Sequence, residues 1–186
     1  MKKVLYIVFM MLIALKVNAN ANMEENKMDN KNILIAYYSY SGNTKKVAEK
    51  IKNEIGGDLF EIKAEGEYPK DYKPMTVQAK KEIDANFRPK LLSKVDDIKK
   101  YDVIFVGSPN WWGTITPQVS SFLEAYDLKG KTVIPFITHG GGGKQNTIKD
   151  FEAQCKDCNI SNSPWVGYNS LTLGLSGWLK DLGLKK

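Results

Sequence analysis

Three unbroken apolar runs of strand length dominate the sequence and limit what it can fold into. They are ILIAYY (33–38), DVIFVG (102–107) and TVIPFI (132–137), and a fourth run, DLFEIKA (58–64), alternates apolar and polar residues. A continuous apolar run indicates a strand buried on both faces, whereas alternation indicates a strand near an edge of the sheet. The chain therefore needs helices on both faces of its sheet.

Helical patterns separate these runs. They occupy residues 44–55, 117–126, 147–155 and 175–184. The first places Val47, Ile51 and Ile55 on one stripe, and the second begins with Pro117, which suits a first helical turn. Alternating strands and helices predict a parallel sheet with right-handed crossovers, and such sheets bind ligands at the carboxyl ends of their strands.

The first apolar run leads into a loop with the residues of an anion site. The loop comprises Ser39, Tyr40, Ser41, Gly42, Asn43 and Thr44. Three hydroxyls, a glycine that admits close backbone approach and the N–H groups of the next helix favour a phosphate group. The sequence has neither a Walker lysine nor a G-x-G-x-x-G after a strand, so nucleoside triphosphates and dinucleotides fit less well. The alternative, a simple Ser/Thr helix cap, accounts for only one hydroxyl.

Two later strand-exit loops carry aromatic residues and glycines. The loop after the run at 102–107 contains Pro109, Asn110, Trp111, Trp112 and Gly113. The loop after the run at 132–137 contains Thr138, His139, Gly140 and Gly141. At about 25 cal/mol per Å² of apolar surface, two exposed tryptophans forgo several kcal/mol, so we expect the core or a flat ligand to cover them. A phosphorylated, flat ring with polar edges would satisfy all three loops.

These loops together resemble those of the flavodoxin family. YYSYSGNT is similar to the family phosphate loop, [ST]-x-[ST]-G-x-T, and YPKDYKPM, GSPNWWGTITPQVSSFLE and LKGKTVIPFITHGGGG follow it in the family's order. The resemblance implies a flavodoxin-like three-layer α/β/α sandwich, with a five-stranded parallel sheet of order 2-1-3-4-5. It also implies one non-covalent FMN, with its phosphate at Ser39–Thr44, its ring beside Pro109–Gly113 and its pyrimidine edge at Thr138–Gly141.

The resemblance further implies an electron carrier. Its FMN would carry one or two electrons between redox partner proteins, so we expect no catalytic residue and no metal site in the chain. Two alternatives stay open, an NAD(P)H-dependent quinone or flavin reductase and a flavin-binding module without redox turnover. His139 either donates to the ring edge or faces solvent. If the backbone at Trp111 and Trp112 is extended, one side chain stacks on the ring and the other packs beneath the loop.

The first nineteen residues have the composition of a secretory signal peptide. A basic start, an apolar run at Val4–Leu15 and small residues around Ala19 form the expected pattern. A helix of about 12 residues spans about 18 Å, less than the ~30 Å hydrocarbon core, so we expect no permanent membrane anchor. We expect a signal peptide at 1–19, a flexible linker at 20–31 and a folded domain at 32–186 that is exported to the periplasm or cell exterior.

Charge gives no support for a nucleic-acid partner. The formal net charge falls from +6 to +3 without residues 1–19, because Lys2, Lys3 and Lys16 are lost. Arg88 is the only arginine, and the lysines alternate with acidic residues. This pattern indicates a mixed, solvated surface, so we expect no nucleic acid among the partners.

Cys155 and Cys158 form a C-x-x-C pair at the predicted end of the helix at 147–155. In an exported chain such a pair favours a structural disulfide. A reduced pair and an electron relay stay open as alternatives. A relay needs a thiol whose pKa is lowered, and the carboxyl end of a helix has the opposite effect.

The region that follows should contain the fifth strand of the sheet. SPWVGY (163–168) is the segment that fits best, although the family pattern weakens after Cys155.

Overall fold

A parallel sheet forms the centre of the molecule in the computed structural model, which describes residues 31–184. The strands are β1 (Ile33–Tyr37), β2 (Asp58–Glu61), β3 (Val103–Pro109), β4 (Thr132–His139), β5 (Asn159–Ile160) and β6 (Trp165–Tyr168). The main path of the sheet runs β2-β1-β3-β4-β5, which confirms the predicted order. The expected signal peptide at 1–19 and all but the last residue of the expected linker lie outside the described residues.

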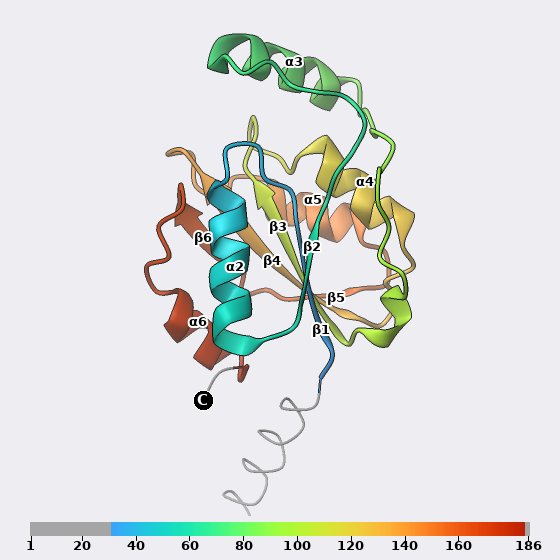
Figure 1. The fold of residues 1–186 in the computed structure, drawn as a ribbon, viewed down its shortest axis with the longest axis vertical. Helices are drawn as coiled ribbons and strands as arrows, with labels where there is room; N and C mark the ends of the chain where they lie inside the picture. Colours follow the sequence, from blue (N-terminus) through green and yellow to red (C-terminus); the bar gives the residue numbers. More distant parts are fainter. Residues whose placement is uncertain (1–30, 185–186) are drawn as a thin grey trace, which may run out of the picture.

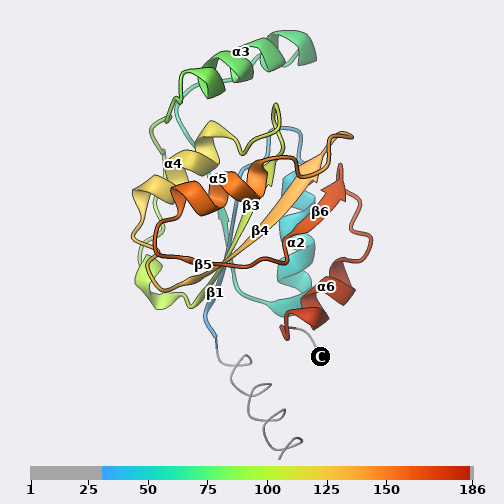
Figure 2. The same ribbon diagram turned by 180° about the vertical axis from the view of Figure 1, so that it is seen from behind.

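Helices cover the sheet from both sides. They are α2 (Asn43–Ile55), α3 (Tyr72–Asp84), α4 (Pro117–Ala125), α5 (Thr147–Gln154) and α6 (Leu175–Asp181), with a 3-10 turn η1 (Ile98–Lys100) before β3. Helices α2 and α6 lie on one face (Figure 1), and α4 and α5 lie on the other (Figure 2). This is the predicted three-layer sandwich. Within residues 31–184, no helix has the length and apolar character that crossing a membrane requires.

The central strands are buried on both faces, as their continuous apolar runs predict. Ile35 and Phe105 belong to the cluster under α2 and α6, and Leu34 and Ile104 belong to the cluster under α4 and α5. All four are at most 1% exposed. Successive side chains of a strand point to opposite faces, so the same short runs supply both layers of the core.

Two short strands share the fifth position of the sheet. β5 pairs with the start of β4 (Thr132↔Asn159), and β6 pairs with its end (Phe136↔Trp165). β6 lies within the segment predicted as the fifth strand, while β5, only two residues long, was not predicted. A disulfide joins Cys155 to Cys158 just before β5, which confirms the structural bridge. It lies near the amino end of β4, away from the strand-exit loops.

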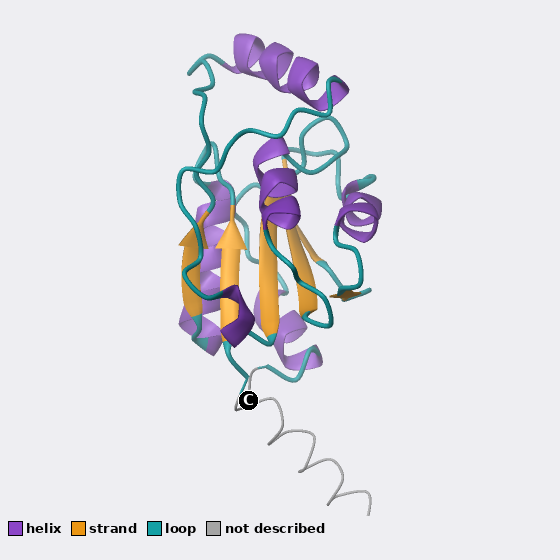
Figure 3. Ribbon diagram, turned by 90° about the vertical axis from the view of Figure 1, so that its right-hand side faces the viewer, coloured by secondary structure: helices purple, strands orange, loops and turns teal. Residues whose placement is uncertain are grey.

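Helix α3 was not predicted, and it stands beyond the carboxyl ends of the strands instead of against a sheet face (Figure 3). Only Met75 and Ala79 of its residues are buried, so its apolar stripe is too narrow to reveal a helix in the sequence. After α3 the chain returns along the α4 side of the sheet, where Leu91 and Val95 pack against the core. An extended segment thus covers part of the sheet face next to β1 and β2.

The packing of β3 against β4 leaves no room for a side chain at Gly107. A Cβ atom there would lie 2.2 Å from Cζ of the fully buried Phe136. We therefore expect Gly107→Ala to lower the free energy of unfolding by about 2–3 kcal/mol through overpacking. Gly177→Ala in α6 is the matched control: its Cβ would meet nothing within 4 Å. Alanine there should add about 0.5–1 kcal/mol. Urea unfolding measures both, and equal stability of the two variants would contradict this account.

Candidate functional site

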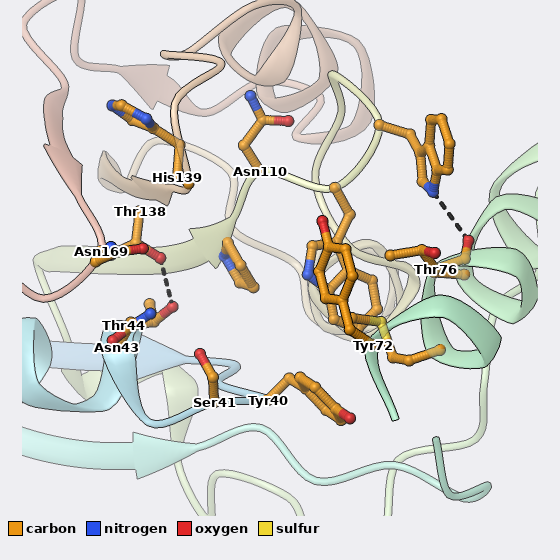
Figure 4. A pocket seen from close by; sticks show the side chains of 16 residues that line it. Tyr40, Ser41, Asn43, Thr44, Tyr72, Thr76, Asn110, Thr138, His139 and Asn169 are labelled. Atoms are coloured by element: carbon orange, nitrogen blue, oxygen red, sulfur yellow. Dashed lines mark hydrogen bonds between the residues drawn. The ribbon is translucent and has the colours of Figure 1, made fainter. Parts of the chain in front are cut away.

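The three predicted loops meet around one cavity of about 480 Å³ at the carboxyl ends of β1, β3 and β4 (Figure 4). The predicted residues that line it are Tyr40, Ser41, Asn43, Thr44, Pro109, Asn110, Trp111, Trp112, Thr138, His139 and Gly140. Ser39, Gly42 and Gly141 belong to the same loops but do not line it. Gly113 lines a smaller adjoining hollow of about 240 Å³, which shares four residues with the cavity, Asn110, Trp112, His139 and Gly140.

The loop after β1 presents an open helix N-terminus. Gly42 precedes α2 in the left-handed conformation (φ 84°), no side chain caps the helix, and its first turn holds no acidic residue. The simple Ser/Thr cap considered from the sequence is therefore wrong. N–H groups at such an end carry partial positive charge and can bind an anion.

The hydroxyls of this loop have different surroundings. Ser39 Oγ is buried and has no hydrogen-bond partner among the described residues, whereas Ser41 is exposed at the cavity. Thr44 Oγ1 lies 2.8 Å from Thr138 Oγ1, and both side chains are buried. This bond ties the loop after β1 to the end of β4. The uncapped helix N-terminus and the nearby hydroxyls of Ser39 and Ser41 fit a phosphate.

Trp111 lies in a cage of tyrosines. Its ring makes edge-to-face contacts with Tyr38, Tyr40 and Tyr68, with centroids 5.8, 6.0 and 5.0 Å away. Tyr40 also donates a hydrogen bond to the carbonyl of Pro69 (2.6 Å). Edge-to-face aromatic pairs add about 0.5–1.5 kcal/mol beyond their buried area, so the cage holds Trp111 in one orientation.

Trp112 sits at the tip of a tight turn. Trp111 and Thr114 pair with each other across it, and both central residues have positive φ, 54° at Trp112 and 87° at Gly113. Positive φ at both central residues is the mark of a type I′ turn, so the backbone is not extended at this position. The Trp112 side chain is 59% exposed, and its Nε1 donates to the carbonyl of Thr76 in α3 (3.0 Å; Figure 4). A tryptophan held at positive φ is strained, which favours a functional role over a structural one.

A polar network connects the tyrosine cage to α3. Tyr68 donates a hydrogen bond to Glu82, and Gln118 Nε2 donates to the Tyr68 hydroxyl (2.9 Å). Gln78 donates to the same carboxylate (2.8 Å). Burial first, then the hydrogen bond to Glu82, raises the pKa of Tyr68 above its ordinary value. Burial and the nearby Glu82 charge likewise raise the pKa of Tyr38.

The loop after β4 closes the remaining side. The Gly141 N–H donates to His139 Nδ1 (3.0 Å), which places the proton of a neutral imidazole on Nε2. The His139 ring packs edge-on against Tyr168, 6.0 Å between centroids. Its carbonyl accepts from the N–H of Asn169 (2.8 Å), a residue at φ 50° that lines the cavity. The loop after β6 thus joins the site.

Sequence reasoning missed five residues that line the cavity. They are Tyr72, Met75, Thr76 and Ala79 from α3 and Asn169 from the loop after β6. Tyr72 and Met75 lie in YPKDYKPM, one of the segments that resemble the flavodoxin family, but no site role was inferred for them. Met75 and Ala79 lie four residues apart, which is helical spacing, but two residues are too few to stand out. Asn169 directly follows SPWVGY (163–168), the expected fifth strand, so its place at a strand exit is the sequence signal that could have identified it.

A parallel sheet of order 2-1-3-4-5, with an uncapped helix N-terminus after its first strand and an aromatic loop after its third, is typical of the flavodoxin-like class of α/β proteins. The chain belongs to the flavodoxin family, whose model matches residues 32–182. A search of curated proteins found none that matches.

Solved structures agree with this assignment. A candidate flavoprotein from Bacteroides eggerthii is 32% identical (TM-score 0.73), with 84% of this chain and 100% of that one covered. A flavoprotein from Lactobacillus acidophilus, solved in complex with FMN, is 30% identical (TM-score 0.66), with 80% and 98% covered. Oxidised flavodoxin 2 from Bacillus cereus shares the fold at 20% identity (TM-score 0.52), with 82% and 94% covered.

The raised pKa of Tyr68 should show in alkaline unfolding. Above about pH 10 the unfolded chain loses its tyrosine protons while folded Tyr68 keeps its own, so the free energy of unfolding falls as pH rises. Tyr68→Phe should make that fall less steep. It should also lower stability below pH 10 by about 1–2 kcal/mol, because Glu82 and Gln118 lose a partner. Urea unfolding at several values between pH 8 and pH 11 tests this.

Tyr72→Phe is the control for that experiment, because the Tyr72 side chain is 74% exposed. It should leave both the stability and its pH dependence unchanged. An unaltered slope in Tyr68→Phe would contradict the role of Tyr68.

Proposed function

We propose that the protein binds one FMN and serves as a flavodoxin-type electron carrier between redox partner proteins. The observation that carries this proposal is the cavity itself: an uncapped helix N-terminus lies at one end and an aromatic turn at the other. The FMN complex of the relative from Lactobacillus acidophilus supports the choice of ligand.

The residues present fit FMN. A cavity of about 480 Å³ is in the usual range for a small ligand of this kind. Ser39, Ser41 and the first N–H groups of α2 would hold the phosphate, and Trp112 would lie against the ring. Thr138, His139 and Gly140 would face the ring edge opposite the tryptophan turn. When bound, FMN supplies the one- or two-electron chemistry, and the chain binds and orients it.

A reductase that acts on small molecules is the second candidate, and α3 is the observation that favours it. Tyr72, Met75 and Thr76 form a wall of the cavity on the side that faces away from the sheet. A wall there narrows the approach of a large partner protein more than that of a small, flat acceptor such as a quinone.

The Cys155–Cys158 disulfide supports the proposal that the protein works outside the cytoplasm. Disulfides persist in oxidising compartments and are rare in the cytosol. A chain exported unfolded would acquire its FMN after export, and its redox partners would be extracytoplasmic.

Steady-state kinetics separate the two candidates. We expect the FMN-loaded protein to accept electrons from dithionite and to pass them to a one-electron acceptor such as cytochrome c. It should oxidise NADH and NADPH only slowly, with or without a quinone. Among the described residues, no sequence motif or cavity feature indicates where a nicotinamide ring would bind. Rapid NAD(P)H oxidation that requires quinone would contradict the carrier and support the reductase.

The two tryptophans should have separable roles. Trp112→Ala removes the exposed ring and should weaken FMN binding about 10- to 100-fold, since stacking is worth about 1–3 kcal/mol, with little effect on the apo fold. Trp111→Ala opens the tyrosine cage and should lower the free energy of unfolding by about 3 kcal/mol. Flavin fluorescence titration and urea unfolding of the apo proteins measure the two effects. Equal losses in both assays would contradict this division.

A further inference from the structure

The Asn110 side chain lies between the tryptophan turn and the glycine loop, and it contacts both. Its Nδ2 donates to the carbonyl of Gly143 (2.6 Å) and to Gln145 Oε1 (3.0 Å). Its Oδ1 accepts from the N–H of Gly113 (2.9 Å). Both N–H donors and the carbonyl of this carboxamide are thus engaged within the chain. Although Asn110 lines the cavity, it does not have an N–H to spare for a ligand.

The peptide groups on both sides of Gly113 are held by this arrangement. Its N–H is bonded to Asn110, and its carbonyl accepts from the N–H of Asn146 (2.9 Å). A Cβ atom at Gly113 or at Gly142 would lie 3.3 Å from Gln145 Oε1, so the Gln145 amide fills the space between the two loops. Gln145 itself has a positive φ of 44°, a strained conformation that its contacts must maintain.

The same bonds fix the strained turn at Trp112. With the Gly113 N–H bound to Asn110, the peptide that follows Trp112 has one orientation, and the indole is directed to its place beside α3. Without these hydrogen bonds, the turn could relax to a conformation in which Trp112 has a negative φ, because a bulky residue disfavours positive φ. The carboxamide therefore offsets the strain of the turn.

We propose that Asn110 is a positioning residue that clasps the tryptophan turn to the glycine loop and so shapes the ring slot before FMN arrives. Gln145 is the other half of the clasp. This inference goes beyond the proposed function and rests on it only for the ligand. It changes the expected role of Asn110 from direct flanking of the ring to action through Trp112 and Gly113.

A double-mutant cycle on the full-length protein tests the clasp. The variants are Asn110→Ala, Gln145→Met and the pair together, with Asn162→Ala, an exposed and distant site, as the control. FMN and riboflavin affinities are measured by flavin fluorescence. We expect Asn110→Ala to weaken both flavins about tenfold, and Gln145→Met to weaken both about threefold. The double variant should bind as Asn110→Ala does, because residues that act as one unit are not additive.

Hydrogen exchange of the apo protein supplies a readout that does not depend on flavin. The clasp predicts faster exchange over residues 110–114 in Asn110→Ala and Gln145→Met, and unchanged exchange in Asn162→Ala. Apo exchange equal to that of the wild type would overturn the proposal, as would additive losses of affinity or a Gln145→Met variant with wild-type affinity. Gln145→Met keeps the test available if Asn110→Ala does not fold.

The two proposals fail in distinguishable ways. A wild-type protein that binds no flavin contradicts the proposed function, whereas the exchange of residues 110–114 still decides the clasp. A loss of affinity for FMN with riboflavin unaffected would indicate a phosphate contact and would also overturn it.

Discussion

Burial of β1, β3 and β4 on both faces is the constraint on which the rest of the structure depends. Parallel strands cannot be joined by tight hairpins, so each must be followed by a crossover that packs on a face. All strand exits then lie at one edge of the sheet. The Thr44–Thr138 hydrogen bond shows how close two of these exits come, although the residues are 94 positions apart. The site is therefore a consequence of the sheet order, and its chemistry comes from the loops.

The crossover from β2 to β3 differs from the others, because its helix does not pack on a face of the sheet. Its helix, α3, leaves the sheet face and lies over the strand exits, while residues that follow it, such as Leu91 and Val95, cover the face in its place. Helix α3 gives the cavity an additional wall, which a helix packed on the sheet would not provide.

Much of this arrangement could be predicted from the sequence, and the failures have physical causes. Apolar runs identified β1, β3 and β4 because buried parallel strands leave a strong pattern, and the three loops followed from the strand ends. Helix α3 escaped because a helix that buries only Met75 and Ala79 has almost no apolar periodicity. The turn at Trp112 escaped because tryptophan at positive φ runs against intrinsic preference. Contacts set by tertiary structure, such as Asn110 to Gln145, have no local pattern at all.

The parts of the site differ in how firmly the fold holds them. The loop after β1 leads directly into α2, whose Val47 and Ile51 are fully buried, so the core anchors the helix that follows this loop. The tryptophan turn and α3 depend instead on polar contacts, namely the Asn110 bonds, Trp112 to Thr76 and Tyr68 to Glu82. Each such bond contributes about 1 kcal/mol net, far less than the core supplies to α2. A flavin phosphate would thus bind at the rigid start of α2. The ring would enter beside the tryptophan turn and α3, the elements whose local opening costs the least free energy.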